Sequence, residues 1–313
     1  MRGTFAQALA VVAACIAATT AGCTSGPPAP TPASSRATAP AAAPSGRSGE
    51  LTDDERLLVQ RAQETLVERC MRAKGFPYWP APLPPADILH GNGYVVDDIG
   101  WARRNGYGTR LRETFLARQR TNRNDAYANT LSPADSGRYA KALLGGPTGS
   151  MLTAELPGGQ RIRTPREGCR AEARDRLYGD FPTWFRVEKT ATSLTGLYLP
   201  ALLRDRRFVA AQEAWATCMR RAGHDYATPP AAREGLAERA KGLSPARAHT
   251  VEVELAVAEA TCASRTPLAA TARALDAEYR ATGLQRYGDD LATYHRMNRT
   301  ALANAEEITG SSG

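Results

Sequence analysis

The side chains that could do chemistry are few, and their spacing matches no common catalytic or metal-binding pattern. The G-x-S-x-G, S-x-x-K and H-E-x-x-H motifs, the P-loop and the calcium loop are absent from the sequence. None of the four histidines has a cysteine or another histidine three or four residues away, the spacing that helical metal sites use; they are His90, His224, His249 and His295. We therefore predict no catalytic residue, no metal and no cofactor, although a Ser-His-Asp triad assembled from distant segments stays open.

Cys218, Met219 and His224 offer sulfur and imidazole ligands that suit Cu(I). However, the segment that begins at Cys218 repeats an earlier one: Cys70-Met71-Arg72-Ala73-Lys74-Gly75-Phe76-Pro77-Tyr78 matches Cys218-Met219-Arg220-Arg221-Ala222-Gly223-His224-Asp225-Tyr226. The first copy has Phe76 where His224 stands, and a disulfide would consume the thiol. We therefore interpret these cysteines as structural.

The strongest signal lies at the N-terminus. Arg2 supplies a short positive region, and the apolar stretch from Phe5 to Ala18 is too short for a stable transmembrane helix. The stretch ends in Thr20-Ala21-Gly22-Cys23, which resembles the lipobox of bacterial lipoproteins, where the cysteine is acylated and becomes the new N-terminus. We predict a lipoprotein signal peptide over residues 1–22 and lipidation of Cys23, which would anchor the chain at the extracytoplasmic face of the cell membrane. A secretory signal cleaved nearby is the alternative.

Composition sets the class of protein and its partners. Residues 23–50 are rich in Pro, Ala, Ser and Thr and bury too little apolar surface to order, so we predict a disordered linker. The mean hydropathy of −0.40 excludes a polytopic membrane protein.

The formal charge of +8 falls to +7 once Arg2 is removed. Such a basic chain is attracted to anionic lipids or wall polymers, although solvated arginines on helix faces explain the charge more simply. Export excludes nucleic acid as a partner.

An even number of cysteines remains in the exported body: Cys70, Cys169, Cys218 and Cys262. In an oxidising compartment four cysteines imply two disulfides, for which three pairings exist. Each repeat copy is followed by a Leu-Ser-Pro-Ala sequence, at 131–134 and 243–246, and then by one further cysteine. The simplest pairing keeps each bridge inside its own half, as Cys70–Cys169 and Cys218–Cys262.

Helix signals are frequent, and strand-like alternation is nearly absent. Thr52 and Glu55 form a capping box. Four further hydroxyl residues precede a proline and predict helix starts: Ser132, Thr164, Ser244 and Thr266. We predict a mostly α fold over residues 51–309, a single disulfide-stapled helical bundle. It would consist of two related halves, about 51–180 and 200–265, followed by C-terminal helices over 267–309.

Several segments give the chain a family resemblance. They are Trp215-Ala216-Thr217-Cys218-Met219 before Gly223, the run 257–262, and Gly106-Tyr107-Gly108 ahead of residues 139–145. With them the chain resembles a group of exported proteins of high-GC Gram-positive bacteria that are commonly lipoproteins. The resemblance implies an all-α fold and carries no activity over to this sequence.

Residues 76–110 are rich in aromatic rings set among turn-forming prolines and glycines. One interpretation is a platform that binds a glycan or peptide through its rings, with Tyr78, Trp79, Tyr94, Trp101 and Tyr107 as the candidate residues. The other is a small core of their own that holds the segment on the helices. The second half has no counterpart of this segment.

The C-terminal segment has apolar residues at spacings of three and four: Leu284, Tyr287, Leu291, Tyr294, Asn298, Ala301, Ala305 and Ile308. So few heptads, with two alanines, favour packing on the body of the same chain, so we predict a monomer.

The expected function is non-catalytic binding of a cell-wall polymer or an exported partner by a membrane-anchored lipoprotein. The alternative is a wall-active hydrolase whose site is assembled in space.

Overall fold

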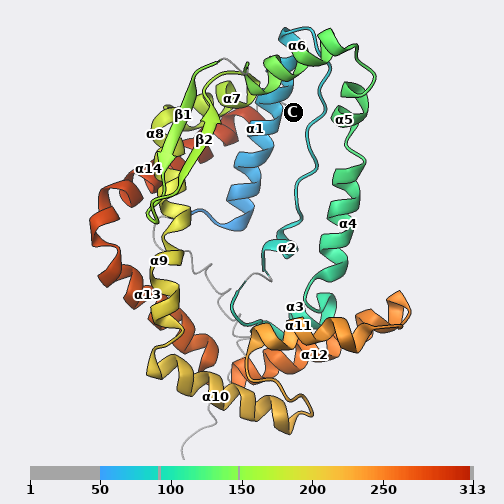
Figure 1. Ribbon diagram of the computed structural model, residues 1–313, viewed down its shortest axis with the longest axis vertical. Coiled ribbons are helices and arrows are strands. Elements are labelled where there is room, and N and C mark those ends of the chain that lie inside the picture. Colours follow the sequence, from blue (N-terminus) through green and yellow to red (C-terminus); the bar gives the residue numbers. More distant parts are fainter. Residues whose placement is uncertain (1–49, 91–92, 147–148, 311–313) are drawn as a thin grey trace, which may run out of the picture. The chain divides into compact units, whose positions relative to one another are not determined.

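The computed structural model describes residues 50–90, 93–146 and 149–310; the predicted signal peptide, Cys23 and all of the predicted linker except Glu50 lie outside these ranges. Most of the described chain is helical, as predicted (Figure 1). The elements are α1 (Asp53–Ala73), α2 (Ala86–His90), α3 (Ile99–Asn105), α4 (Thr109–Arg120), α5 (Arg123–Ala128), α6 (Pro133–Leu144), β1 (Met151–Glu155), β2 (Arg161–Pro165), α7 (Cys169–Tyr178), α8 (Phe181–Ser193), α9 (Thr195–Leu202), α10 (Arg206–Arg221), α11 (Pro229–Ala240), α12 (Pro245–Arg265), α13 (Leu268–Gly283), the 3-10 turn η1 (Gln285–Tyr287) and α14 (Gly288–Gly310).

The predicted caps explain where several helices begin. Thr52 accepts a hydrogen bond from the Glu55 amide and Glu55 accepts one from the Thr52 amide, so the capping box of α1 is confirmed. Ser132 and Ser244 cap α6 and α12 ahead of their prolines. The predicted cap at Thr266 is wrong: Pro267 is the residue that precedes α13, no side chain caps this helix, and the Thr266 hydroxyl donates to the Cys262 carbonyl.

One predicted helix start is wrong. Thr164 and Pro165 end β2, which pairs with β1 in an antiparallel hairpin in which Thr164 lies opposite Leu152. Helix α7 begins only at Cys169, after Gly168, whose φ of +92° is left-handed and which lies so close to Gly145 that a side chain would not fit. Residues 156–160 form a tight turn that joins two paired strands, so the segment around Thr164 is a strand and not the start of a helix.

A first core surrounds the disulfide between Cys70 and Cys169, whose Cα atoms are 5.5 Å apart. It is built from α1, α6, α7 and α14, with the segment that follows α1. Its fully buried side chains include Met71 and Leu177. This disulfide is one of the two that the repeat predicted.

A second core surrounds the disulfide between Cys218 and Cys262, with Cα atoms 5.7 Å apart, which confirms the other predicted bridge. Helices α10, α12 and α13 supply most of it, and Trp215, Phe208 and Leu255 are almost completely buried. Residues 94–111 join the same core from the first half of the sequence. A small third cluster packs the hairpin onto α8 through Ala154, Phe181 and Phe185.

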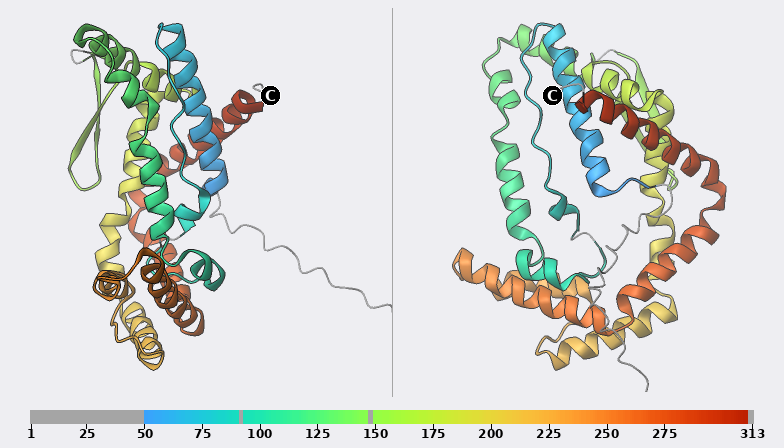
Figure 2. Two further views of the ribbon diagram at one scale, coloured as in Figure 1. Left: turned by 90° about the vertical axis from the view of Figure 1, so that its right-hand side faces the viewer. Right: turned by 180° about the vertical axis from the view of Figure 1, so that it is seen from behind.

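The two cores therefore coincide only in part with the predicted halves. Residues 94–111 belong to the predicted first half but pack in the second core, and the end of α14 packs in the first. The reason is that α14 contacts α1, α7 and α8, while α3 contacts α12. In both views of Figure 2 the dark red α14 lies beside the blue α1.

The C-terminal helix packs on its own chain, as the heptad spacing predicted. Ala301, Ala305 and Ile308 are buried against α1 and α7. Small alanines at these positions let the helices approach closely. Among the described helices, none is long and apolar enough to cross a membrane.

Candidate binding cleft

The predicted aromatic platform is largely inside the protein. Tyr78, Trp101 and Tyr107 expose only 3%, 2% and 6% of their surface, while Trp79 and Tyr94 are half-buried. Burial of Tyr78, Trp101 and Tyr107 in the two cores favours the alternative interpretation, in which the rings hold this segment on the helices. Their ring faces are occupied by the protein, and a ligand could reach only Trp79 and Tyr94, whose part in binding stays a prediction.

Tyr78 and Trp79 attach the segment after α1 to the first core. The Tyr78 hydroxyl donates to Glu64 on α1 at 3.0 Å, and burial raises the pKa of that hydroxyl well above its usual value. The Trp79 amide and carbonyl form a pair of hydrogen bonds with the buried side chain of Asn124. Arg123 lies over the Trp79 ring, 4.5 Å from its centre, and covers one face.

Two buried glutamates on α12 hold residues 94–109 in the second core. The carboxylate of Glu259, which is fully buried, accepts from the Val96 amide at 2.8 Å, from Arg233 at 2.9 Å and from the Tyr107 hydroxyl at 2.8 Å. About two helical turns earlier on α12, the side chain of Glu252 accepts hydrogen bonds from the amides of Tyr107 and Thr109. Burial raises the pKa values of both Glu259 and Tyr107. These contacts make the segment part of the scaffold.

The cysteines also have a structural role. Sγ atoms of Cys70 and Cys169 lie near a carboxylate oxygen of Glu172, a grouping with metal-site spacing. Both sulfur atoms are in the disulfide, however, so neither supplies a thiolate to a metal. Glu172 instead pairs with Lys74 at 2.6 Å. Cys23, the predicted lipidation site, lies outside the described residues.

A cleft of about 690 Å³ opens between α1, α7, α8 and α14, close to the volume of a site for a small molecule. Polar and aromatic side chains line most of it. Its lining residues are Glu50, Leu51, Arg56, Val59, Gln60, Gln63, Glu64, Leu83, Arg174, Tyr178, Trp184, Glu188, Ala191, Thr192, Thr195, Arg280, Leu291, Tyr294, His295 and Asn298.

The three arginines of the cleft differ in their pairing. Arg56 pairs with Asp53 at 2.8 Å, and Arg280 pairs with Asp276 at 3.2 Å. Arg174 makes no hydrogen bond or ion pair with any described residue, and its Nε atom is buried. Its guanidinium carbon lies 5.5 Å from the centre of the Phe181 ring. Burial, together with the neighbouring charge of Arg170, lowers the pKa of Arg174.

Aromatic rings form one wall of the cleft. Tyr178 at the end of α7 stacks on Trp184 of α8, with ring centres 4.0 Å apart and an angle of 23° between the planes. The indole Nε1 of Trp184 is buried and has no hydrogen-bond partner among the described residues. Tyr294 of α14 also lines the cleft, and burial raises the pKa of both tyrosines. The wall offers apolar ring surface to the cleft.

Two of the glutamates in the cleft make contacts with nearby groups, whereas a histidine nitrogen does not. Glu188 lies 3.0 Å from Lys189, and Glu64 accepts from Tyr78 and from the Ala81 amide. The Nδ1 atom of His295 is buried and has no partner among the described residues. Neither serine nor aspartate is among the lining residues of this cleft, so it does not contain the Ser-His-Asp set of the hydrolase hypothesis.

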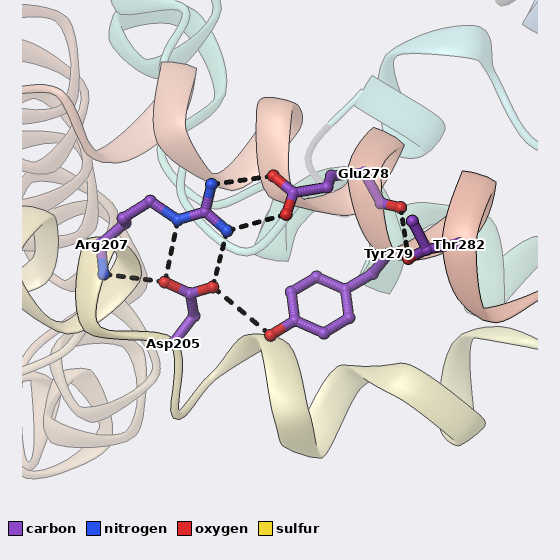
Figure 3. Close-up of polar contacts among 5 residues, drawn as sticks. All are labelled: Asp205, Arg207, Glu278, Tyr279 and Thr282. Atoms are coloured by element: carbon purple, nitrogen blue, oxygen red, sulfur yellow. Dashed lines mark hydrogen bonds and ion pairs between the residues drawn. The ribbon is translucent and has the colours of Figure 1, made fainter.

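A second polar network joins α10 to α13 outside the cleft (Figure 3). Arg207 donates to both carboxylate oxygens of Asp205 and to both of Glu278, and the Tyr279 hydroxyl donates to Asp205 at 3.4 Å. Hydrogen bonds from Arg207 lower the pKa of Asp205 to about 2. The carboxylates already satisfy the guanidinium, so this network is structural.

Sequence reasoning named only part of the cleft. Leu291, Tyr294 and Asn298 were expected on the inner face of the C-terminal helix, and they do face the cleft. Arg174 and Trp184 were missed, because neither stands in a recognisable motif. Their proximity arises from the packing of α7 and α8 on α14, which no local pattern encodes.

The chain matches no protein-family model, and comparison with curated proteins and with solved structures found no similar chain. The resemblance to exported proteins of high-GC Gram-positive bacteria therefore stays a prediction. Function has to be inferred from the cleft itself.

Proposed function

We propose that the protein is a membrane-anchored, extracytoplasmic lipoprotein that binds a cell-envelope component in the cleft without transforming it. The observation that supports binding is a cleft of ligand size that combines a stacked aromatic wall with Arg174, which makes no ion pair with any described residue. The lipobox-like sequence before Cys23 supports the anchor.

Blocking the cleft tests the binding part of the proposal. Ala191 lines the cleft from α8, so a tryptophan at this position would fill it. Full-length protein in detergent is incubated with purified, lipid-free cell wall, to which the proposed lipid anchor does not bind, and the retained fraction is measured. We expect Ala191→Trp to lose retention while its melting temperature stays near that of the parent.

The matched control is Ala117→Trp, which places the same ring on an exposed position of α4 away from the cleft. This control should be retained as well as the parent. Equal retention of a folded Ala191→Trp variant would contradict the proposal. Release of soluble fragments from the envelope by the parent, lost in His295→Gln, would instead support the hydrolase.

The anchor is tested separately in cells. Cys23→Ala should release the protein from the membrane fraction or leave its precursor unprocessed, because acylation needs the thiol. Labelled palmitate that still enters the Cys23→Ala protein would contradict the lipoprotein assignment.

A further inference from the structure

The unpaired guanidinium in the cleft points to the charge of the ligand. An arginine withdrawn from water normally lies against a carboxylate or another acceptor, because desolvation of an uncompensated charge is costly. Half-buried Arg280 follows this rule with Asp276. Arg174 does not, although it is half-buried and its Nε is out of contact with water.

Among the described residues no carboxylate forms a direct ion pair with Arg174, and the charge of Glu188 on the next helix acts on it only at longer range. Of the three glutamates in the lining, Glu188 pairs with Lys189, and Glu64 accepts from Tyr78 and the Ala81 amide. Glu50 lies 3.5 Å from Arg280. The neighbouring charge on α7 is that of Arg170, which adds positive rather than negative potential. A negatively charged ligand in the cleft could therefore form the ion pair that Arg174 does not make with any described residue.

The surroundings of Arg174 indicate what carries this negative charge. Tyr178 and Trp184 place ring surface in the same cleft, from the same helix and the one that follows. Aromatic walls of this kind hold the apolar faces of sugars and other rings, while a guanidinium binds carboxylate or phosphate oxygens in a bidentate manner. The volume of 690 Å³ admits one or two such rings.

We propose that the cleft binds a sugar-sized ring compound that bears a carboxylate or phosphate group, and that Arg174 is the residue that binds this anion. This inference rests on the proposed binding function of the same cleft and adds the chemical class of the ligand. Trp184 and Tyr178 hold the ring, and the charge of the ligand supplies the partner that Arg174 lacks.

Three small probes separate charge from ring recognition. Glucuronate carries a carboxylate, glucose 6-phosphate carries a phosphate, and glucose carries neither. Each is titrated by calorimetry into full-length protein in detergent. We expect at least one of the two anions to saturate the parent, with an affinity at least tenfold above that of glucose. The tighter anion identifies the source of the charge.

Variants on α7 provide the matched pair. Arg174→Gln should weaken binding of the anion at least tenfold, and Arg174→Lys should recover part of that loss because it keeps the charge without the planar fork. Arg170→Gln, on the same helix but outside the cleft lining, should change the affinity less than twofold. Since Arg174 makes no hydrogen bond with any described residue, Arg174→Gln and Arg174→Lys should melt near the parent.

Equal binding of glucose and the anions, saturation by none of them, or a folded Arg174→Gln protein with parental affinity would overturn the assignment. Envelope retention distinguishes this failure from that of the proposed function. If Ala191→Trp abolishes retention and Arg174→Gln leaves it intact, the cleft binds an envelope component by other groups and only the anion inference fails. If neither variant alters retention, both proposals fail.

Discussion

Replacing Glu259 by alanine removes the acceptor that joins residues 94–109 to α12. The Val96 amide, the Tyr107 hydroxyl and the Arg233 guanidinium all donate to this carboxylate at 2.8–2.9 Å. In Glu259→Ala these donors would remain in a site that water reaches poorly. The substitution therefore removes an ion pair and leaves two neutral donors unsatisfied at once.

The expected loss of stability follows from this arrangement. Breaking a buried ion pair by removing one partner costs about 3–5 kcal/mol. At 2–4 °C for each kcal/mol, the melting temperature should fall by roughly 6–20 °C. Glu259→Gln keeps one carbonyl acceptor for Val96 and Arg233 and should lose only about 1–3 kcal/mol.

Urea unfolding followed by tryptophan fluorescence measures the effect directly, since Trp101 and Trp215 lie in the second core. The control is Glu254→Ala, an exposed glutamate on the same helix, for which we expect a change within about 0.5 kcal/mol. A loss below about 1 kcal/mol in Glu259→Ala, or an equal loss in both variants, would refute the idea that Glu259 holds the segment.

Three further outcomes are expected. Gly106→Ala should lower the free energy of unfolding by about 1–3 kcal/mol more than Gly223→Ala. Both glycines have a positive φ, but a Cβ at Gly106 would lie 2.6 Å from Glu252, whereas a Cβ at Gly223 would have nothing within 4 Å. Equal losses of stability in thermal unfolding would contradict this reasoning. Replacing both cysteines of the Cys70–Cys169 bridge by alanine should lower the free energy of unfolding by about 5 kcal/mol, and the same change at Cys218–Cys262 by about 4 kcal/mol. The difference arises because the bridged residues are 99 and 44 positions apart in sequence. Urea midpoints in the opposite order would argue against a loop-entropy origin of this stability. The lowered pKa of Asp205 means that this carboxyl binds its proton less tightly in the native state than in the unfolded state. The contribution of Asp205 to stability is therefore complete above about pH 4 and is lost as pH falls through about 2. Asp205→Asn should flatten this part of the acid unfolding profile, and an unchanged profile would exclude the network of Figure 3 as the cause of acid unfolding there.

The cysteine pairing and the mostly α fold could be predicted because both follow from short sequence patterns. The repeat placed Cys70 and Cys218 at equivalent helix ends, and the caps at Thr52, Ser132 and Ser244 marked helix starts. Thr164 failed because the same hydroxyl–proline pattern also fits the end of a strand, and strand pairing across a glycine turn decided between them.

The aromatic segment shows why burial is harder to predict than structure class. Proline and glycine neighbours suggested exposed rings, yet Trp101 and Tyr107 are buried. The cause lies far away in the sequence, where Glu252 and Glu259 stand seven residues apart on one face of α12 and accept the hydrogen bonds of the segment. Two buried glutamates on a helix give no local sign of their partner.

The crossing of segments between the two cores has a consequence for how the chain is made. Ribosomes deliver the chain from its N-terminus, so α1, α6 and α7 exist long before α14 does. Until Ala301, Ala305 and Ile308 arrive, the apolar face of α1 that they cover stays open. The core that begins first along the chain is therefore completed only when the C-terminal helix is present.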